Sequence, residues 1–252
     1  MSSPDVTAVV NLHRERESCV PTLRSLEAAA SFAESAGHTV ERLVLLDNAD
    51  DRTGTVARKV LGDDARYVES DAGDLGLARN RAAAEANGIY SCFLDGDDLW
   101  GFRWIERAFV AAQAADRDAV WHPAVNFISG KMPHVYHHLG SEDRMFKPSR
   151  FRLHNGWTAL SFAKTSLYRD IPYPPNLLKS GFGYEDWSWN TETLRQGIPH
   201  RVVAGTSHYI NKRESSLLTS SVHALPTRYH TLDWDALNSP STVSASAGDQ
   251  NG

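Results

Sequence analysis

Apolar residues in the first half of the chain fall in four short runs that are separated by longer helical patterns. The runs are rich in Val, Leu and other strand-forming residues, and they occupy residues 6–12, 42–46, 66–69 and 90–94. The stretches between them have helical spacing and each is followed by a glycine; they cover residues 20–36, 53–61 and 75–86. Repeated strand–helix–strand units predict an α/β fold with a mostly parallel sheet that is covered by helices on both faces.

The second half of the chain has a weaker pattern. Residues 104–115 predict another helix and residues 119–122 another strand, whereas residues 126–148 predict an irregular excursion or a hairpin. Order returns over residues 156–167, and residues 184–196 predict a helix after a loop rich in Pro and Gly. From residue 238 onward the chain has almost no large apolar residue, which predicts a disordered tail over 238–252.

Polar side chains stand at the carboxyl ends of three of the predicted strands. They are Asn11, the pair Asp47-Asn48 and the acidic segment Asp95-Gly96-Asp97-Asp98. In open α/β sheets, ligands bind beyond the carboxyl ends of the strands. The pattern therefore predicts a binding site at this edge of the sheet.

The acidic segment 95–98 is the clearest candidate for chemistry. Three carboxylates within four residues repel one another unless a cation or several hydrogen-bond donors neutralise them. A hard divalent ion with oxygen ligands does so, and Gly96 allows a tight turn close to a ligand. An acidic turn in which Asp98 caps the next helix is the alternative. The position directly after a buried apolar strand favours the metal site.

Three further segments combine polar groups with a structural alternative. The amide and carboxylate groups of Asp47 and Asn48 could read a nucleobase, or belong to a loop that caps the next helix. Arg79, near the start of a helix, could meet a diphosphate or lie on the helix surface. The adjacent acids Glu185 and Asp186 at a helix start suit a general base, although acids there are also favoured by the helix dipole.

Taken together, these segments resemble the inverting family 2 glycosyltransferases, which have a GT-A fold. Residues 8–14 are similar to the first strand of that family, and residues 45–53 to its nucleotide-binding loop, with Ala49-Asp50 in place of the commoner Gly-Ser. Residues 76–82 are similar to its Gly- and Arg-Asn-containing segment, residues 93–100 to its Asp-x-Asp motif, and residues 184–187 to its Glu-Asp pair. Five motifs in the same order are far more specific than any one of them.

The resemblance implies a role for each matched residue. Asp47 and Asn48 would hold the base with help from Asn11, Arg79 and Gly96 would belong to the nucleotide-sugar site, and Asp95 would contact the ribose or the metal. Asp97 would bind Mn²⁺ or Mg²⁺, and His208 is a further candidate metal ligand, beside Lys212 and Arg213, which could reach the phosphates. Asp186, next to Glu185, would deprotonate the acceptor hydroxyl, and UDP-sugars are the donors the resemblance favours.

The resemblance also implies the domain organisation. One GT-A domain would span residues 1–237, with a nucleotide-sugar-binding half over about 5–122 and an acceptor-binding half over about 123–237. Processive relatives carry a Gln-x-x-Arg-Trp motif after the base; this sequence has none, so we expect single transfers. A glycan, a lipid-linked glycan or a small molecule could be the acceptor, and the oligomeric state stays open.

Composition narrows the setting of this activity. The net charge of −5 gives no reason to expect binding to nucleic acid, and no apolar stretch is long enough to predict a membrane span, although peripheral membrane contact is compatible with the sequence. The sequence shows no secretory signal, and its two cysteines are too few for a disulfide framework, so we expect a cytoplasmic protein. The spacing of the histidines between residues 134 and 154 does not fit a zinc site.

Two rival functions share this kind of fold. A nucleotidyltransferase would usually have a glycine-rich basic loop after the first strand, whereas this chain has residues 12–17 without glycine there. A non-catalytic GT-A-like binding module would have lost the acids of the Asp-x-Asp or Glu-Asp motifs, and both motifs are present.

Overall fold

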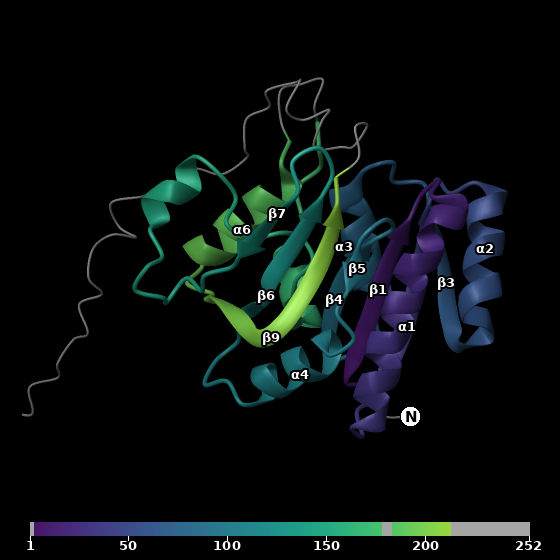
Figure 1. Cartoon of the computed structure of the whole chain (residues 1–252), viewed down its shortest axis with the longest axis horizontal. Helices are drawn as coiled ribbons and strands as arrows, with labels where there is room; N and C mark the ends of the chain where they lie inside the picture. Colours follow the sequence, from purple (N-terminus) through teal and green to yellow (C-terminus); the bar gives the residue numbers. More distant parts are fainter. Residues whose placement is uncertain (1–2, 178–182, 213–252) are drawn as a thin grey trace, which may run out of the picture.

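The computed structural model describes residues 3–177 and 183–212. Its first half alternates strands and helices in the order β1 (Val6–Leu12), α1 (Val20–Ser35), β2 (Val40–Asp47), α2 (Asp51–Leu61), β3 (Ala65–Ser70), α3 (Leu75–Glu85) and β4 (Tyr90–Asp95). The second half contains β5 (Leu99–Trp100), α4 (Trp104–Gln113), β6 (Val120–Ser129), β7 (His134–His137), β8 (Phe162–Lys164), α5 (Thr165–Asp170), α6 (Glu185–Arg195) and β9 (His200–Asn211). Figure 1 shows the two halves side by side.

All of these strands belong to one mixed sheet. Its order is β3-β2-β1-β4-β8-β6-β9-β5, and β7 pairs with β6 outside that path. The strands β3, β2, β1 and β4 are parallel, β8 is antiparallel to both β4 and β6, and β6 and β9 are parallel to each other. The predicted α/β class with a mostly parallel sheet is confirmed, and the change of direction at β8 separates the two halves.

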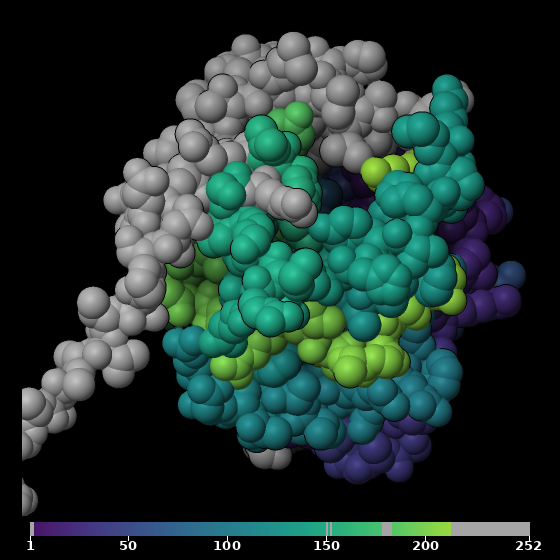
Figure 2. All heavy atoms as spheres, turned by 60° about the vertical axis from the view of Figure 1, so that its left-hand side comes forward, coloured from purple at the N-terminus to yellow at the C-terminus, as the bar shows by residue number. Residues whose placement is uncertain are grey.

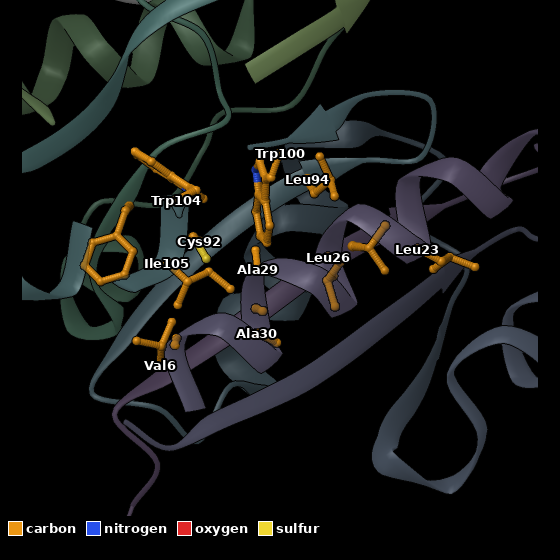
Figure 3. Close-up of a cluster of buried hydrophobic side chains, with 14 of the residues drawn as sticks. Val6, Leu23, Leu26, Ala29, Ala30, Cys92, Leu94, Trp100, Trp104 and Ile105 are labelled. Atoms are coloured by element: carbon orange, nitrogen blue, oxygen red, sulfur yellow. The ribbon is translucent and has the colours of Figure 1, made fainter. Parts of the chain in front are cut away.

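Alternate residues of the central strands feed two separate cores. Val10, Val44 and Leu94 pack with α1 and α4 on one face, where Figure 3 shows Leu23, Leu26 and Trp104 around the sheet. Val9, Leu43 and Phe93 pack on the other face against α3, α5 and α6. Because side chains alternate along a strand, a strand buried on both faces appears as a continuous apolar run. This explains why the sequence indicated these strands so clearly.

The helices of the first half begin at side-chain caps. Asp50 accepts a hydrogen bond from the backbone N–H of Thr53 and starts α2, and Asp74 does the same from Leu77 for α3. Both caps follow directly on strand ends or their loops, so each helix leaves the same edge of the sheet. Asp50 and Asp74 therefore have a structural role. For the loop over residues 47–53, this agrees with the alternative interpretation, in which the loop caps the next helix.

The second half departs from the sequence-based expectation in detail. The excursion over 126–148 contains a hairpin, because β6 extends to Ser129 and pairs with β7. The two-residue strand β5 is too short to leave a periodic pattern, and it exists through pairing with β9. The proposed boundary at 123 falls inside β6, and residues 213–237 and the tail at 238–252 lie outside the described residues, so the domain limits stay a prediction. No helix in the described part of the chain is long and apolar enough to cross a membrane.

A buried arginine ties three of these elements together. The guanidinium of Arg79, on α3, is 1% exposed and donates to Asp95 at the end of β4 at 2.9 Å and to Glu185 at the start of α6 at 2.9 Å. Burial alone would lower the pKa of Arg79, but the charges of Asp95 and Glu185 prevail and raise it above its ordinary value. Arg79 therefore stays charged and joins the first half of the fold to the second.

The approach of β4 to β1 gives a first stability prediction. A Cβ atom at Gly88 would lie 2.4 Å from the backbone nitrogen of Thr7, so Gly88→Ala must push apart two central strands. We expect a loss of about 1–3 kcal/mol in the free energy of unfolding by overpacking. The matched control is Gly54→Ala inside α2, where the nearest atom is the mobile end of Arg58 and helix propensity favours Ala by about 1 kcal/mol. Urea denaturation measures both, and equal effects would contradict the prediction.

The ion pairs of Arg79 give a second stability prediction. Arg79→Leu leaves the carboxylates of Asp95 and Glu185 without their buried partner, which typically costs about 3–5 kcal/mol. Arg81→Leu, on the same helix, removes only a half-exposed pair with Glu85 and should cost less than about 1 kcal/mol. Thermal and urea unfolding compare the two variants. A small effect at both positions would show that the buried bridge does not hold the two halves.

Candidate active site

A cavity of about 780 Å³ opens at the carboxyl ends of β1, β2 and β4, and both halves of the chain line it. The structure brings most of the predicted site residues to this cavity: Asn11, Asp47, Arg79, Asp95, Gly96, Asp97, Glu185 and Asp186. Asn48 and His208 are not among its lining residues. Segments that are 175 positions apart in the sequence thus meet at one site (Asn11 and Asp186), because parallel strands end at a common edge and Arg79 joins the start of α6 to that edge.

The side chain of Asn11 is buried at the end of β1 and has no partner. It is 6% exposed, and neither its amide nitrogen nor its oxygen has a hydrogen-bond partner among the described residues. A buried amide left unpaired costs free energy unless a ligand or water satisfies it. Gly96 lies directly beside it, where a Cβ atom would be 2.9 Å from the carbonyl oxygen of Asn11. The floor of the cavity therefore has both an unpaired amide and an obligatory glycine.

Asp47 and Asn48 shape the loop beside this floor. Both carboxylate oxygens of Asp47 accept from the backbone N–H of Gly73, at 3.1 and 3.2 Å, while its carbonyl contacts Nδ1 of His13 at 2.6 Å. Asn48 has a left-handed backbone with φ of 47°, and its N–H donates to the carbonyl of Ser70. Asp47 thus has a structural contact and a place in the cavity wall, whereas Asn48 supports the loop. Their predicted contact with a base stays a prediction.

The acidic segment that follows β4 concentrates negative charge. Asp98 is 5% exposed and accepts a hydrogen bond from the backbone N–H of Asn211 at 2.8 Å. Burial, together with the charges of Asp95 and Asp97, raises the pKa of Asp98 well above its usual value. Asp98 therefore supports the turn through Asn211, and all three carboxylates of the segment line the cavity.

These carboxylates fit a hard divalent cation. Within the described residues, no three His, Cys, Asp or Glu side chains form a complete metal site. Mg²⁺ and Mn²⁺ accept carboxylate and phosphate oxygens and keep part of their shell for water and substrate, so one or two protein ligands suffice. The donor set at Asp95 and Asp97 is therefore suited to an ion that shares a diphosphate with the protein.

Asp186 lines the same cavity from the start of α6. Its Oδ2 accepts from the side-chain amide of Asn155 at 3.0 Å, and Oδ1 accepts from the backbone N–H of Trp187 at 2.7 Å. Asn155 is itself held by a hydrogen bond from Asn190. Burial, and next the charge of Glu185, raise the pKa of Asp186 to about 7. A carboxylate with this pKa is well matched to take up a proton near neutral pH.

The backbone before Asp186 is unusual. Tyr184 adopts a left-handed conformation with φ of 57°, which a bulky residue rarely occupies. Such backbone positions cost energy and persist where surrounding contacts fix them, often at functional sites. Here the neighbouring Glu185 is held by Arg79, so the strained turn presents Glu185 towards α3.

His208 lies beneath the site in β9. Its ring is fully buried and packs edge-on against Trp104 at 4.6 Å, and neither ring nitrogen has a hydrogen-bond partner among the described residues. Burial lowers the pKa of His208 well below its ordinary value, so the ring is neutral. Its predicted contact with a metal stays a prediction. Lys212 lines the cavity, and Arg213 lies outside the described residues.

Tryptophans often stack on sugars, but two tryptophans near this site are part of the core. Trp157 is 2% exposed and stacks with His200 at 4.0 Å and with Phe146 at 5.3 Å, and it also lines the cavity. Trp189 is 1% exposed and stacks on Tyr173. Asn155, which orients Asp186, could not be predicted from the sequence. An asparagine in a loop without a periodic pattern does not indicate which residue it will contact.

Comparison with known proteins agrees with this geometry. The sequence model described as glycosyl transferase family 2 matches residues 7–172, which is more than half of the chain. The search of curated proteins finds no match.

Two solved structures have a similar fold. The chain is similar to residues 1–349 of S. aureus TarS in complex with UDP-GlcNAc, with a TM-score of 0.65 and 19% identity over 87% of this chain and 61% of that chain. It is also similar to the mannosyltransferase PcManGT from Pyrobaculum calidifontis in complex with GDP-Man and Mn²⁺, with a TM-score of 0.60 and 15% identity over 86% of this chain and 59% of that chain. The chain therefore spans less than two thirds of the length of either structure, and identities this low show the fold alone. From the matched sequence and the shared fold, the chain belongs to glycosyl transferase family 2 and carries a glycosyltransferase domain with a GT-A fold.

Proposed function

We propose that the protein is a metal-dependent, inverting glycosyltransferase that moves a sugar from a nucleoside diphosphate sugar to a hydroxyl group of an acceptor, one transfer at a time. The observation that carries this proposal is the placement of acidic groups from both halves of the chain in one cavity. Asp95 and Asp97 come from the first half and Asp186 from the second, and Arg79 links the two halves through Asp95 and Glu185.

The first half of the chain would bind the donor. The unpaired amide of Asn11, together with Asp47 and Asn48, would hold the nucleoside, with uridine as the favoured one. Asp95 and Asp97 would hold Mn²⁺ or Mg²⁺. When bound, such an ion neutralises the charge that develops on the departing nucleoside diphosphate. TarS and PcManGT, whose solved complexes contain UDP-GlcNAc and GDP-Man with Mn²⁺, support a donor of this class.

Asp186 would act as the base. It takes the proton of the acceptor hydroxyl while that oxygen forms a bond with the anomeric carbon, and the bond from this carbon to the diphosphate oxygen breaks on the opposite side. The configuration at the anomeric carbon is inverted in this single displacement. Asn155 fixes the orientation of the Asp186 carboxylate, and Glu185 stays paired with Arg79 and keeps the turn in place. The contacts that orient Asp186 and Glu185 already exist in the structure, before any ligand binds.

The state of the two cysteines bears on the compartment in which the protein acts. Cys19 and Cys92 are free and buried, which agrees with a reducing cytoplasm. Burial raises the pKa of Cys19 to about 11, so it is not a reactive thiol. We propose that the protein acts in the cytoplasm on a nucleotide sugar and a hydroxyl-bearing acceptor.

Nucleotide binding gives a prediction that does not require the acceptor. UDP, GDP, dTDP and CMP are each added with and without Mn²⁺, and thermal unfolding is recorded. We expect one nucleoside diphosphate to stabilise the protein only with Mn²⁺, by about 2.7 kcal/mol at 100 times its dissociation constant. Asp97→Asn should lose this stabilisation because it removes a metal ligand.

The matched control is Asp116→Asn, an exposed residue that pairs with Arg201 far along the chain from the site. It should keep the wild-type response. If no nucleotide stabilises the wild type with either Mn²⁺ or Mg²⁺, the metal-dependent transfer fails and the non-catalytic binding module takes its place.

The pKa of Asp186 gives the pH dependence. The base works only when it is deprotonated, and its pKa is raised to about 7, so kcat/KM should rise with pH up to about 7 and fall about tenfold per unit below it. Asp186→Asn should lower kcat by about 10²–10⁴-fold and leave nucleotide binding unchanged. Initial rates of sugar transfer from the stabilising donor, measured from acid to neutral pH, test both. A flat pH profile, or an active Asp186→Asn variant, would exclude Asp186 as the base.

A further inference from the structure

The wall of the cavity that comes from the second half contains buried polar atoms with no partner. Asn126 on β6 is fully buried, and neither its amide nitrogen nor its oxygen is hydrogen-bonded among the described residues. His138, just after β7, is 5% exposed with Nε2 unpaired, and Thr158 has an unpaired buried hydroxyl. All three residues line the same cavity as Asp186.

The hairpin of β6 and β7 places Asn126 and His138 on one face of the sheet. Asn126 lies directly opposite Tyr136 on β7, and residues opposite each other share one face. His138 follows two residues after Tyr136 and therefore points to the same face. Tyr136 also lines the cavity, and its hydroxyl donates to the carbonyl of Gly156 at 3.2 Å. The backbone N–H of His138 donates to Ala124 at 3.1 Å. The hairpin is thus anchored to the loop that carries Thr158.

The chemistry of His138 is fixed by its other ring nitrogen. Nδ1 lies 2.8 Å from the carbonyl oxygen of Pro123, which can only accept, so Nδ1 carries the proton. Burial lowers the pKa of His138 to about 4, so the ring is neutral at pH 7. Nε2 is therefore a hydrogen-bond acceptor that a hydroxyl of a ligand or a water molecule can satisfy.

The three side chains together define the kind of group that would satisfy them. Nε2 of His138 accepts, whereas Asn126 and Thr158 each both donate and accept. A hydroxyl group does both, so several hydroxyls on one ligand would pair with all of these atoms. Among the described lining residues the cations are Arg79, which is held by two carboxylates, and Lys212, so Asn126, His138 and Thr158 themselves bring no positive charge that would favour a phosphate.

We propose that Asn126, His138 and Thr158 form a hydroxyl-binding subsite for a neutral sugar or polyol unit of the acceptor. The word acceptor rests on the proposed function, whereas the binding of a neutral polyhydroxylated ligand does not. The subsite is tied to the base through one short loop, because Asn155 holds Asp186 and Thr158 follows three residues later. A hydroxyl of the bound unit would thereby be positioned beside Asp186.

Binding of defined probes to the full chain tests the subsite. The probes are the methyl glycosides of glucose, galactose, mannose and N-acetylglucosamine, with glucitol as an open-chain polyol and glucose 6-phosphate as the charged comparison. Saturation-transfer NMR and calorimetry are recorded with and without UDP and Mn²⁺. We expect at least one neutral probe to bind, and glucose 6-phosphate to bind more weakly than glucose derivatives without the phosphate.

Three variants locate the binding. His138→Phe, Asn126→Leu and the nearly isosteric Thr158→Val should each weaken the bound probe by about tenfold, because each loses one or two hydrogen bonds. The matched control is His137→Phe, an exposed residue on the same hairpin that does not line the cavity. It should bind the probe as the wild type does. Unfolding temperatures are compared for all four, and Thr158→Val keeps the test open if a larger change disturbs folding.

The outcomes separate this proposal from the proposed function. If no neutral probe binds, or if the three variants bind as tightly as the wild type, the subsite is overturned. An equal loss in His137→Phe also overturns it, because the effect then comes from the hairpin as a whole. Nucleotide stabilisation measured on the same samples reports on the transferase proposal alone. Probe binding that disappears in the variants while nucleotides never bind would support the subsite and reject the transferase.

Discussion

The rest of the structure depends on the two ion pairs of Arg79. A guanidinium that is nearly inaccessible to water contacts Asp95, at the end of the last parallel strand of the first half, and Glu185, at the start of α6 in the second half. Moving three charges out of water is costly, and the cost is repaid only when geometry and charge match closely. Replacing Arg79 would leave the carboxylates of Asp95 and Glu185 without their cation. The bridge therefore sets the position of α6 relative to the end of β4 more strictly than apolar packing could, since apolar contacts tolerate small shifts.

The helix that carries Arg79 can reach this position because of its small residues. Ala78 and Ala82 are buried against the sheet, and a Cβ atom at Gly76 would lie 2.6 Å from the carbonyl oxygen of Pro174. Asn80 exchanges two hydrogen bonds of 2.8 Å with the backbone of Tyr173, which fastens the following loop. The Gly and Arg-Asn positions of this segment thus have separate physical tasks: one permits close approach, one bridges the charges, and one holds the loop.

The second half of the chain is organised around β9. Figure 2 shows β9 in yellow-green as a band across this face of the molecule, between α4 and the residues of the β6–β7 region.

The sequence predicts the parts of this molecule that follow local rules. Strands buried on both faces, such as β1, β2 and β4, were indicated by their runs of apolar residues, and their polar ends located the cavity at Asn11, Asp47 and Asp95. The short strand β5 and the alignment of β6 with β9 depend on pairing between distant segments, which leaves no periodic signal. The partners of Arg79 were equally hidden: on an alanine-rich helix it could have been a surface residue, and only the fold shows that it is buried. Asn155 and the unpaired atoms of Asn126 and His138 have no motif, because their significance lies in what surrounds them.

The carboxyl side chains that line the cavity outnumber its cations. Eight carboxyl side chains from the described residues line it (Glu15, Asp47, Asp74, Asp95, Asp97, Asp98, Glu185 and Asp186), against the cations Arg79 and Lys212. Burial is the first cause of the raised pKa values of Asp98 and Asp186, and the neighbouring carboxylates add to it because like charges oppose one another's ionisation. A diphosphate would add more negative charge and would be repelled unless a cation came with it. The same excess of carboxylates thus raises the pKa of Asp186 and would favour a cation beside a bound diphosphate. The neutral wall of Asn126 and His138 lies outside this conflict, since a hydroxylated ligand brings no charge to it.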